Sequence, residues 1–112
     1  MDKALLDAAF RLVSHSLTAQ EARFYPLTTV DARINELGKQ FPESDLQTLK
    51  EADSHAQRLE EVAIAMADRA RGPQNDNSGP PLNEQSLAAR CPGFSSESYF
   101  WAINDGYVLT RN

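Results

Sequence analysis

The sequence predicts an all-α protein, an irregular bundle of five or six helices around one long helix at residues 43–71, with a C-terminal helical hairpin. Apolar residues recur at spacings of three and four through most of the chain, which is the period of one helix face. The only alternating run that favours a strand is the short tail 107–110. The length of 112 residues fits one core, so we expect a single helical domain, 1–112.

Composition narrows the class of protein. Hydrophobic residues make up 41% and charged residues 24%, which is typical of soluble globular chains and excludes a disordered tail or a disulfide scaffold. The single cysteine, Cys91, allows no intrachain disulfide and favours a reducing compartment. A net charge of −5 argues against generic attraction to nucleic acid or to anionic membranes.

The sequence shows no pattern typical of a membrane-spanning helix or of a secretory signal. No apolar stretch approaches the roughly 18–20 residues of a membrane helix. The start of the chain is acidic, whereas a secretory signal begins with basic residues and continues with a long apolar run. We therefore expect a cytoplasmic protein with no membrane partner.

The first predicted helix covers residues 2–17. Its apolar stripe has the spacing of one helix face, and Asp7 and Arg11 are placed to pair weakly on its surface. The segment from Thr18 to Glu21 has the capping-box form, in which a hydroxyl and a carboxylate each accept from the other's free amide. A short second helix should therefore follow Thr18 and end before Pro26.

A third helix should begin after Thr28 or Thr29, because threonine side chains cap helix N-termini. Its apolar positions are Val30, Ile34 and Leu37. Gly38 is the expected stop, since glycine favours the residue just past a helix end.

The long helix at 43–71 has no breaker between Pro42 and the Gly72-Pro73 pair. Its apolar residues follow a seven-residue repeat typical of near-antiparallel helix packing. The repeat comprises Leu49, Ala52, Ala56, Leu59, Ala63, Met66 and Ala70. This 49–70 seam favours an internal bundle contact, and the alternative is a homodimer through the same seam.

The segment 72–82 is rich in turn formers and reads as a mobile loop before the C-terminal helical pair. Asn83 should cap a short helix over 84–90. Ser95 should cap the last helix, with Phe94 and Tyr99 in the hydrophobic-staple arrangement. The last helix either ends at Gly106 or continues to residue 110.

Candidate catalytic and metal-binding residues are few. Cys91 with His55 as a base is the only arrangement that offers an enzyme, and no recognisable cysteine-enzyme motif surrounds it. Glu51 and His55 share a helix face, but no further ligand extends that pair into a metal site. The adjacent acids at 60 and 61 point about 100° apart, so we interpret them as a solvated face. We expect no catalytic residue, no metal and no cofactor.

Residues 85–103 follow the helix–turn–helix pattern of short helix, glycine turn and capped second helix. The start of the second helix lacks the Lys, Arg, Asn or Gln that would read bases and phosphates. A transcriptional regulator using residues 85–103 is therefore the alternative function, and the same residues also fit a plain helical hairpin.

Aromatic residues gather near the C-terminal end and carry the leading hypothesis. The predicted partner-binding set is Trp101, Phe100, Tyr99, Tyr107 and Phe94. Tryptophan and tyrosine are frequent hot spots of protein interfaces, and an acidic chain suits a basic partner. The sequence therefore favours a non-enzymatic interaction module, such as an adaptor, a chaperone or a toxin-neutralising protein, with Trp101 as the anchor. Packing of both faces of the last helix inside the core is the alternative.

Overall fold

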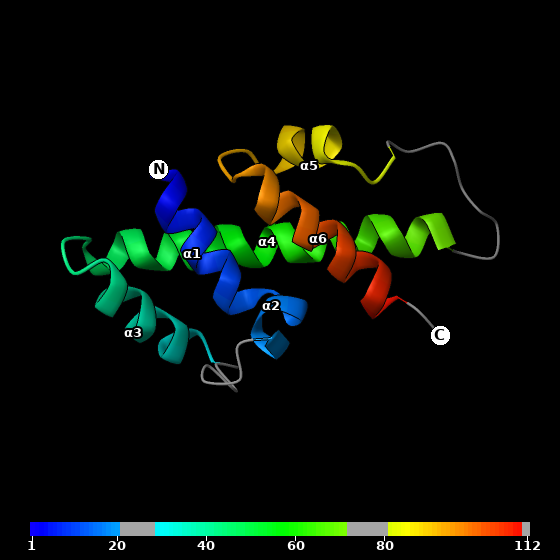
Figure 1. Ribbon diagram of the computed structural model, residues 1–112. Helices are drawn as coiled ribbons and strands as arrows, with labels where there is room; N and C mark the ends of the chain where they lie inside the picture. Colours follow the sequence, from blue (N-terminus) through cyan, green and yellow to red (C-terminus); the bar gives the residue numbers. More distant parts are fainter. Residues whose placement is uncertain (21–28, 72–80, 111–112) are drawn as a thin grey trace.

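The computed structural model describes residues 1–20, 29–71 and 81–110, and these form an all-α bundle (Figure 1). Six helices lie within these ranges. They are α1 (Lys3–Val13), α2 (His15–Gln20), α3 (Val30–Gln40), α4 (Leu46–Arg71), α5 (Glu84–Arg90) and α6 (Ser96–Leu109). The predicted all-α bundle around one long helix is thereby confirmed. The predicted loop 72–82 lies largely outside the described residues.

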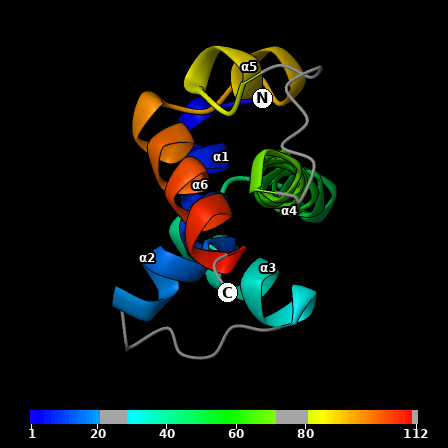
Figure 2. The same cartoon turned by 90° about the vertical axis from the view of Figure 1, so that its right-hand side faces the viewer.

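α4 is the central rod of the bundle. Its 26 residues extend for about 39 Å at 1.5 Å per residue. The helix begins at Leu46, three residues later than the predicted 43, because the Asp45 side chain caps it by accepting from the Thr48 amide at 2.7 Å. Seen along α4, α1 and α6 cover one side of the rod, α5 lies above them, α2 lies below them and α3 lies below α4 (Figure 2).

The predicted first helix is divided into two. Ser14 adopts an extended conformation, with φ −61° and ψ 126°, so α1 ends at Val13 and α2 starts at His15. The predicted capping role of Thr18 is wrong, because Thr18 lies inside α2 and its hydroxyl donates to the Ser14 carbonyl at 2.8 Å. The helix predicted to follow Thr18 falls mostly on residues 21–28, outside the described residues.

The start of α3 follows the prediction and its end does not. The Thr29 side chain accepts from the Ala32 amide at 3.1 Å and caps the helix. Gly38, the expected stop, lies inside α3, which continues to Gln40. Helix C-termini are weakly encoded, because a glycine is tolerated inside a helix at a cost of about 1 kcal/mol when packing continues past it.

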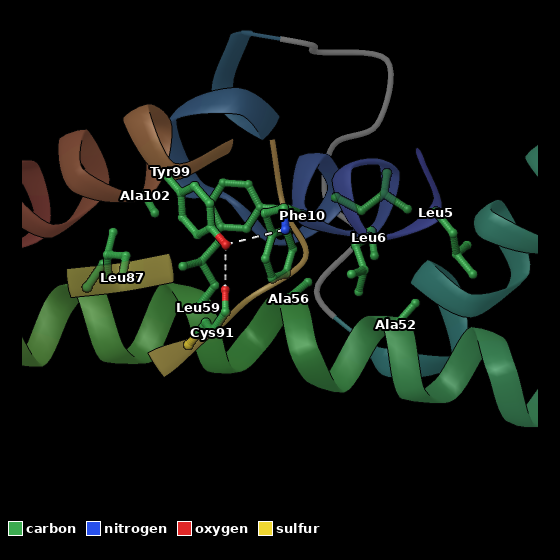
Figure 3. Close-up of a cluster of buried hydrophobic side chains, with 14 of the residues drawn as sticks. Leu5, Leu6, Phe10, Ala52, Ala56, Leu59, Leu87, Cys91, Tyr99 and Ala102 are labelled. Carbon is green, nitrogen blue, oxygen red and sulfur yellow. Dashed lines mark hydrogen bonds between the residues drawn. The ribbon is translucent and has the colours of Figure 1, made fainter. Parts of the chain in front are cut away.

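The seven-residue seam of α4 is buried inside the chain. Ala52, Ala56, Leu59 and Ala63 have no exposed surface, and they pack under α1 and α6 with Phe10 among their neighbours (Figure 3). Exposed Ala70 is the exception along the repeat. The seam therefore makes the predicted contact inside the bundle. The alternative, a homodimer through residues 49–70, would need this surface, and almost all of it is already covered by other helices of the same chain.

The C-terminal hairpin of α5 and α6 is closed by a tight turn. Gly93 has φ 103°, a conformation that favours glycine, and a Cβ atom there would come within 2.9 Å of Leu6. The Tyr99 hydroxyl donates to the Cys91 carbonyl at 2.7 Å and accepts from the Phe94 amide at 3.4 Å (Figure 3). One phenol thus satisfies two backbone groups of the turn and holds it on the core.

α6 continues to Leu109 and crosses α4 at very short range. Gly106 lies inside α6, and a Cβ atom built on it would be 2.7 Å from the Ala63 carbonyl oxygen of α4. The absence of a side chain at Gly106 is therefore what allows the two backbones to approach. Ala102, one turn earlier on α6, is also fully buried.

Candidate functional site

The five aromatic residues of the predicted partner-binding set divide between core and surface. Phe94 and Tyr99 are 5% and 4% exposed, and their rings pack edge to face with centroids 5.9 Å apart. Phe94 also packs edge to face on Phe10 of α1. The predicted hydrophobic staple is confirmed. Both residues belong to the core, so their predicted place in a partner-binding surface is corrected.

Phe100, Trp101 and Tyr107 are the members of the set that reach the surface, and we call them the aromatic surface. Phe100 is 62% exposed and Tyr107 is 36% exposed. They are seven residues apart, two turns of helix, and therefore lie on the same face of α6. Trp101 is half-buried, and its ring meets that of Phe100 edge to face at 5.4 Å.

A second polar arrangement ties the start of α6 to α1. The Asp7 carboxylate of α1 accepts from the Ser95 amide at 3.0 Å and from the Ser98 hydroxyl at 2.7 Å. The predicted N-cap, Ser95, also accepts from the Ser98 amide. A carboxylate at a helix N-terminus is favoured by the helix dipole, so Asp7 serves the α6 terminus instead of the predicted surface pair with Arg11.

The start of α2 is held by two buried acids from other helices. Asp105 of α6 accepts from the Ser16 amide at 3.1 Å and from the Ser14 hydroxyl. Glu60 of α4 accepts from the His15 amide at 3.0 Å. These contacts join the α1–α2 junction to α4 and to α6. They explain why the chain bends at Ser14 instead of continuing as one helix.

Glu60 lies in the interior close enough to Asp105 for that carboxylate to affect its protonation. Asp105 has no exposed surface and Glu60 is 8% exposed. Burial raises the pKa of Glu60 from 4.5 to about 9, reinforced by its hydrogen bond to Asp105 and the negative charge there, while the His15 amide lowers it. Oε1 of Glu60 accepts from no protein donor, so a proton on this carboxyl, donated to Asp105, satisfies both groups.

This acid pair holds α2 in place and is not arranged for catalysis. A substrate would have to reach a carboxyl that is fully buried and already accepts from Ser14 and Ser16. The sequence-based interpretation of residue 60 as part of a solvated face is wrong. Its neighbour Glu61 is exposed, as expected.

A further buried ion pair joins α3 to α4. Arg33 donates through Nε to Asp53 Oδ1 at 2.7 Å and through Nη2 to Oδ2 at 3.3 Å. Gln57 also donates to the Asp53 carboxylate. Asp53 is 1% exposed, so this bidentate pair sets the position of α3 on the rod.

The other candidate residues lie apart from any assembled site. Cys91 is 5% exposed, and burial raises the pKa of its thiol although Arg58 partly opposes the effect, whereas a reactive thiol needs a lowered pKa. His55 is exposed on α4, as is Glu51. Within residues 1–20, 29–71 and 81–110, no group of three or more potential His, Cys, Asp or Glu ligands gathers as a metal site.

The sequence reasoning missed three polar features, which are the Asp7 cap, the acid pair and the Arg33–Asp53 ion pair. Asp105 offered one signal, because an acid is unusual on a buried helix and the stretch from Tyr99 to Val108 is apolar apart from Asn104 and Asp105. Glu60 offered a signal in its position along α4. It comes directly after Leu59 and three residues before Ala63, so it lies beside two positions of the buried repeat. Neither signal names the partner, which comes from another helix.

Comparison of the chain with protein-family models, with curated proteins and with solved structures finds no match. Across the part of the chain that the structure describes, no helix combines the length and the apolar character needed to cross a membrane.

Proposed function

We propose that this protein is a non-enzymatic interaction module that binds a protein partner through the aromatic surface of α6. The observation that carries the proposal is the exposure of Phe100, 62%, on a helix whose opposite face is buried in the core as far as Gly106. Large exposed aromatic side chains gain the most free energy when a partner covers them.

The arrangement of the aromatic surface supports this role. Phe100 and Tyr107 share one face over two turns, and Trp101 widens that face by packing its ring against Phe100. The partner that best suits the chain carries positive charge, because the net charge is −5 and Glu97, one turn before Phe100, is exposed.

Phe100 replaces Trp101 as the residue of choice for a test. Trp101 packs partly against the core, so its removal would change stability as well as binding. Phe100→Ser should leave the unfolding free energy within about 0.5 kcal/mol of wild type, as for most surface substitutions. Leu46→Ser is the matched control, because Leu46 is 58% exposed in the first turn of α4, away from the aromatic surface.

The experiment is a capture from lysate with wild type and both variants as bait, read by quantitative mass spectrometry. A partner retained by wild type and Leu46→Ser but lost with Phe100→Ser supports the proposal. Equal recovery of every captured protein by all three baits would refute it.

A further inference from the structure

A groove lies between the C-terminal half of α4 and the end of α6. It has a volume of about 430 Å³, within the range of ligand-binding clefts. Its lining comprises Glu61, Ile64, Ala65 and Asp68 of α4 with Leu109 and Thr110 of α6. The C-terminal end of α4 extends past α6 in this region (Figure 1). We call this feature the acidic groove.

The α4 side of the acidic groove is a single helical stripe. Positions three, four and seven residues apart share a helix face, so all four α4 residues point to the same side. Ile64 and Ala65 form the apolar centre of the stripe. Glu61 and Asp68 are exposed at its two ends, about 10 Å apart along the axis. Apolar surface thus lies between two carboxylates.

The α6 side adds apolar surface that is separate from the aromatic surface. Leu109 is 41% exposed. It follows Phe100 by nine positions, and nine steps of about 100° turn it to the opposite side of α6. The two surfaces therefore use different faces of the same helix, and a ligand in the acidic groove does not need Phe100.

We propose that the acidic groove binds a cationic amphipathic helix from a partner protein, laid along α4. Leucine or methionine side chains of that helix cover Ile64 and Leu109, and the small Ala65 lets its backbone come close. Lysine or arginine residues one heptad apart meet Glu61 and Asp68 at the two ends.

Charge selects this occupant over the alternatives. The net charge of −5 attracts a cationic segment and repels nucleic acid and anionic lipid. A second copy of the same groove would bring its own carboxylates against Glu61 and Asp68, and like charges across an interface are unfavourable. A neutral apolar peptide would leave both carboxylates without a partner.

The test uses two synthetic helical peptides with the same leucine face, one with lysines flanking it at heptad spacing and a twin with glutamates there. Each is titrated into the full-length protein and followed by amide chemical shifts. The lysine peptide should shift the amides of 61–68 and 109–110, and raising the salt concentration should weaken it. The glutamate twin should bind at least tenfold more weakly.

Variants separate the charge from the apolar floor. The double change Glu61→Gln with Asp68→Asn should weaken the lysine peptide about threefold to tenfold, since both carboxylates are exposed. Leu109→Asp should weaken binding of the lysine peptide by about tenfold or more, because it places a charge in the apolar part of the acidic groove. Leu46→Asp, an exposed leucine outside the groove, is the control and should leave the affinity unchanged.

Three results would overturn the inference. These are equal affinity for the two peptides, shifts confined to the aromatic surface, and shifts that depend on protein concentration without any peptide, which would indicate self-association. Glu61→Gln and Asp68→Asn keep the size of two exposed side chains, so the amide spectrum of the double variant should remain that of the folded protein. Shifts confined to the aromatic surface would support the role proposed for Phe100, and the other two outcomes leave that role untouched.

Discussion

Replacing Glu60 by glutamine should remove a pH dependence from the stability of this protein. In the folded state the pKa of Glu60 is raised to about 9, chiefly by burial and then by Asp105, against an ordinary value of 4.5. Between these two values the folded protein holds a proton that the unfolded chain releases. Unfolding therefore liberates a proton, and stability is highest at the acidic end of the window and falls as pH rises.

The magnitude follows from the linkage relation. One proton released on unfolding changes the free energy of unfolding by about 1.4 kcal/mol per pH unit. Raising the pH from 6 to 8 should therefore remove on the order of 3 kcal/mol from this group alone. That is a large fraction of the roughly 5–15 kcal/mol that stabilises a typical domain, so the effect should be measurable.

The glutamine variant tests the cause. Its amide can donate to Asp105 and its carbonyl can accept from the His15 amide, which preserves the contacts of the protonated acid without ionisation. We expect Glu60→Gln to match wild type within about 1 kcal/mol at pH 5 and to exceed it by roughly 4 kcal/mol at pH 8.

The assay is urea denaturation at constant ionic strength from pH 5 to 8, followed by circular dichroism. Glu61→Gln is the matched control, because Glu61 is the exposed neighbour on the same helix and its substitution should keep the wild-type slope. Taking differences between variants cancels the contributions of all other titrating groups. A wild-type stability that is flat or rising over this range, or a Glu60→Gln slope equal to that of wild type, would show that Glu60 is not a buried, protonated acid.

Two further predictions concern packing and the buried ion pair. Gly106→Ala should lower the free energy of unfolding by about 1–3 kcal/mol, because its Cβ would be 2.7 Å from the Ala63 carbonyl, whereas Gly38→Ala, whose Cβ has ordinary contact at 3.6 Å, should stabilise by up to about 1 kcal/mol. Equal effects of the two alanines in thermal unfolding would contradict this account of the α4–α6 crossing. Arg33→Met should lower the free energy of unfolding by about 3–5 kcal/mol in urea denaturation, because it leaves the buried Asp53 carboxylate without its cation. A loss below about 1 kcal/mol, as expected for a surface salt bridge, would show that the ion pair contributes little.

Most helix starts in this protein were predictable from local sequence, and the reason is physical. An N-cap side chain bonds to an amide only three residues further on. Local sequence therefore predicts the helix starts at Thr29, Asn83 and Ser95. The buried seam of α4 was predictable for a similar reason, because a long apolar repeat specifies which face must be covered. The division of the aromatic residues was not, since exposure depends on how α6 is rotated against α4 and α1.

Local sequence thus specified an all-α bundle, its long helix and most of its caps, because those features depend on residues a few positions apart. The break at Ser14 and the role of Glu60 depend on Asp105, which is 91 residues from Ser14 and meets it only after α6 folds across α4. The same holds for Gly106, whose purpose is visible only at the helix crossing. Contacts between distant segments form only with tertiary packing, and so does the low dielectric that burial creates around them. A local sequence pattern therefore cannot predict them.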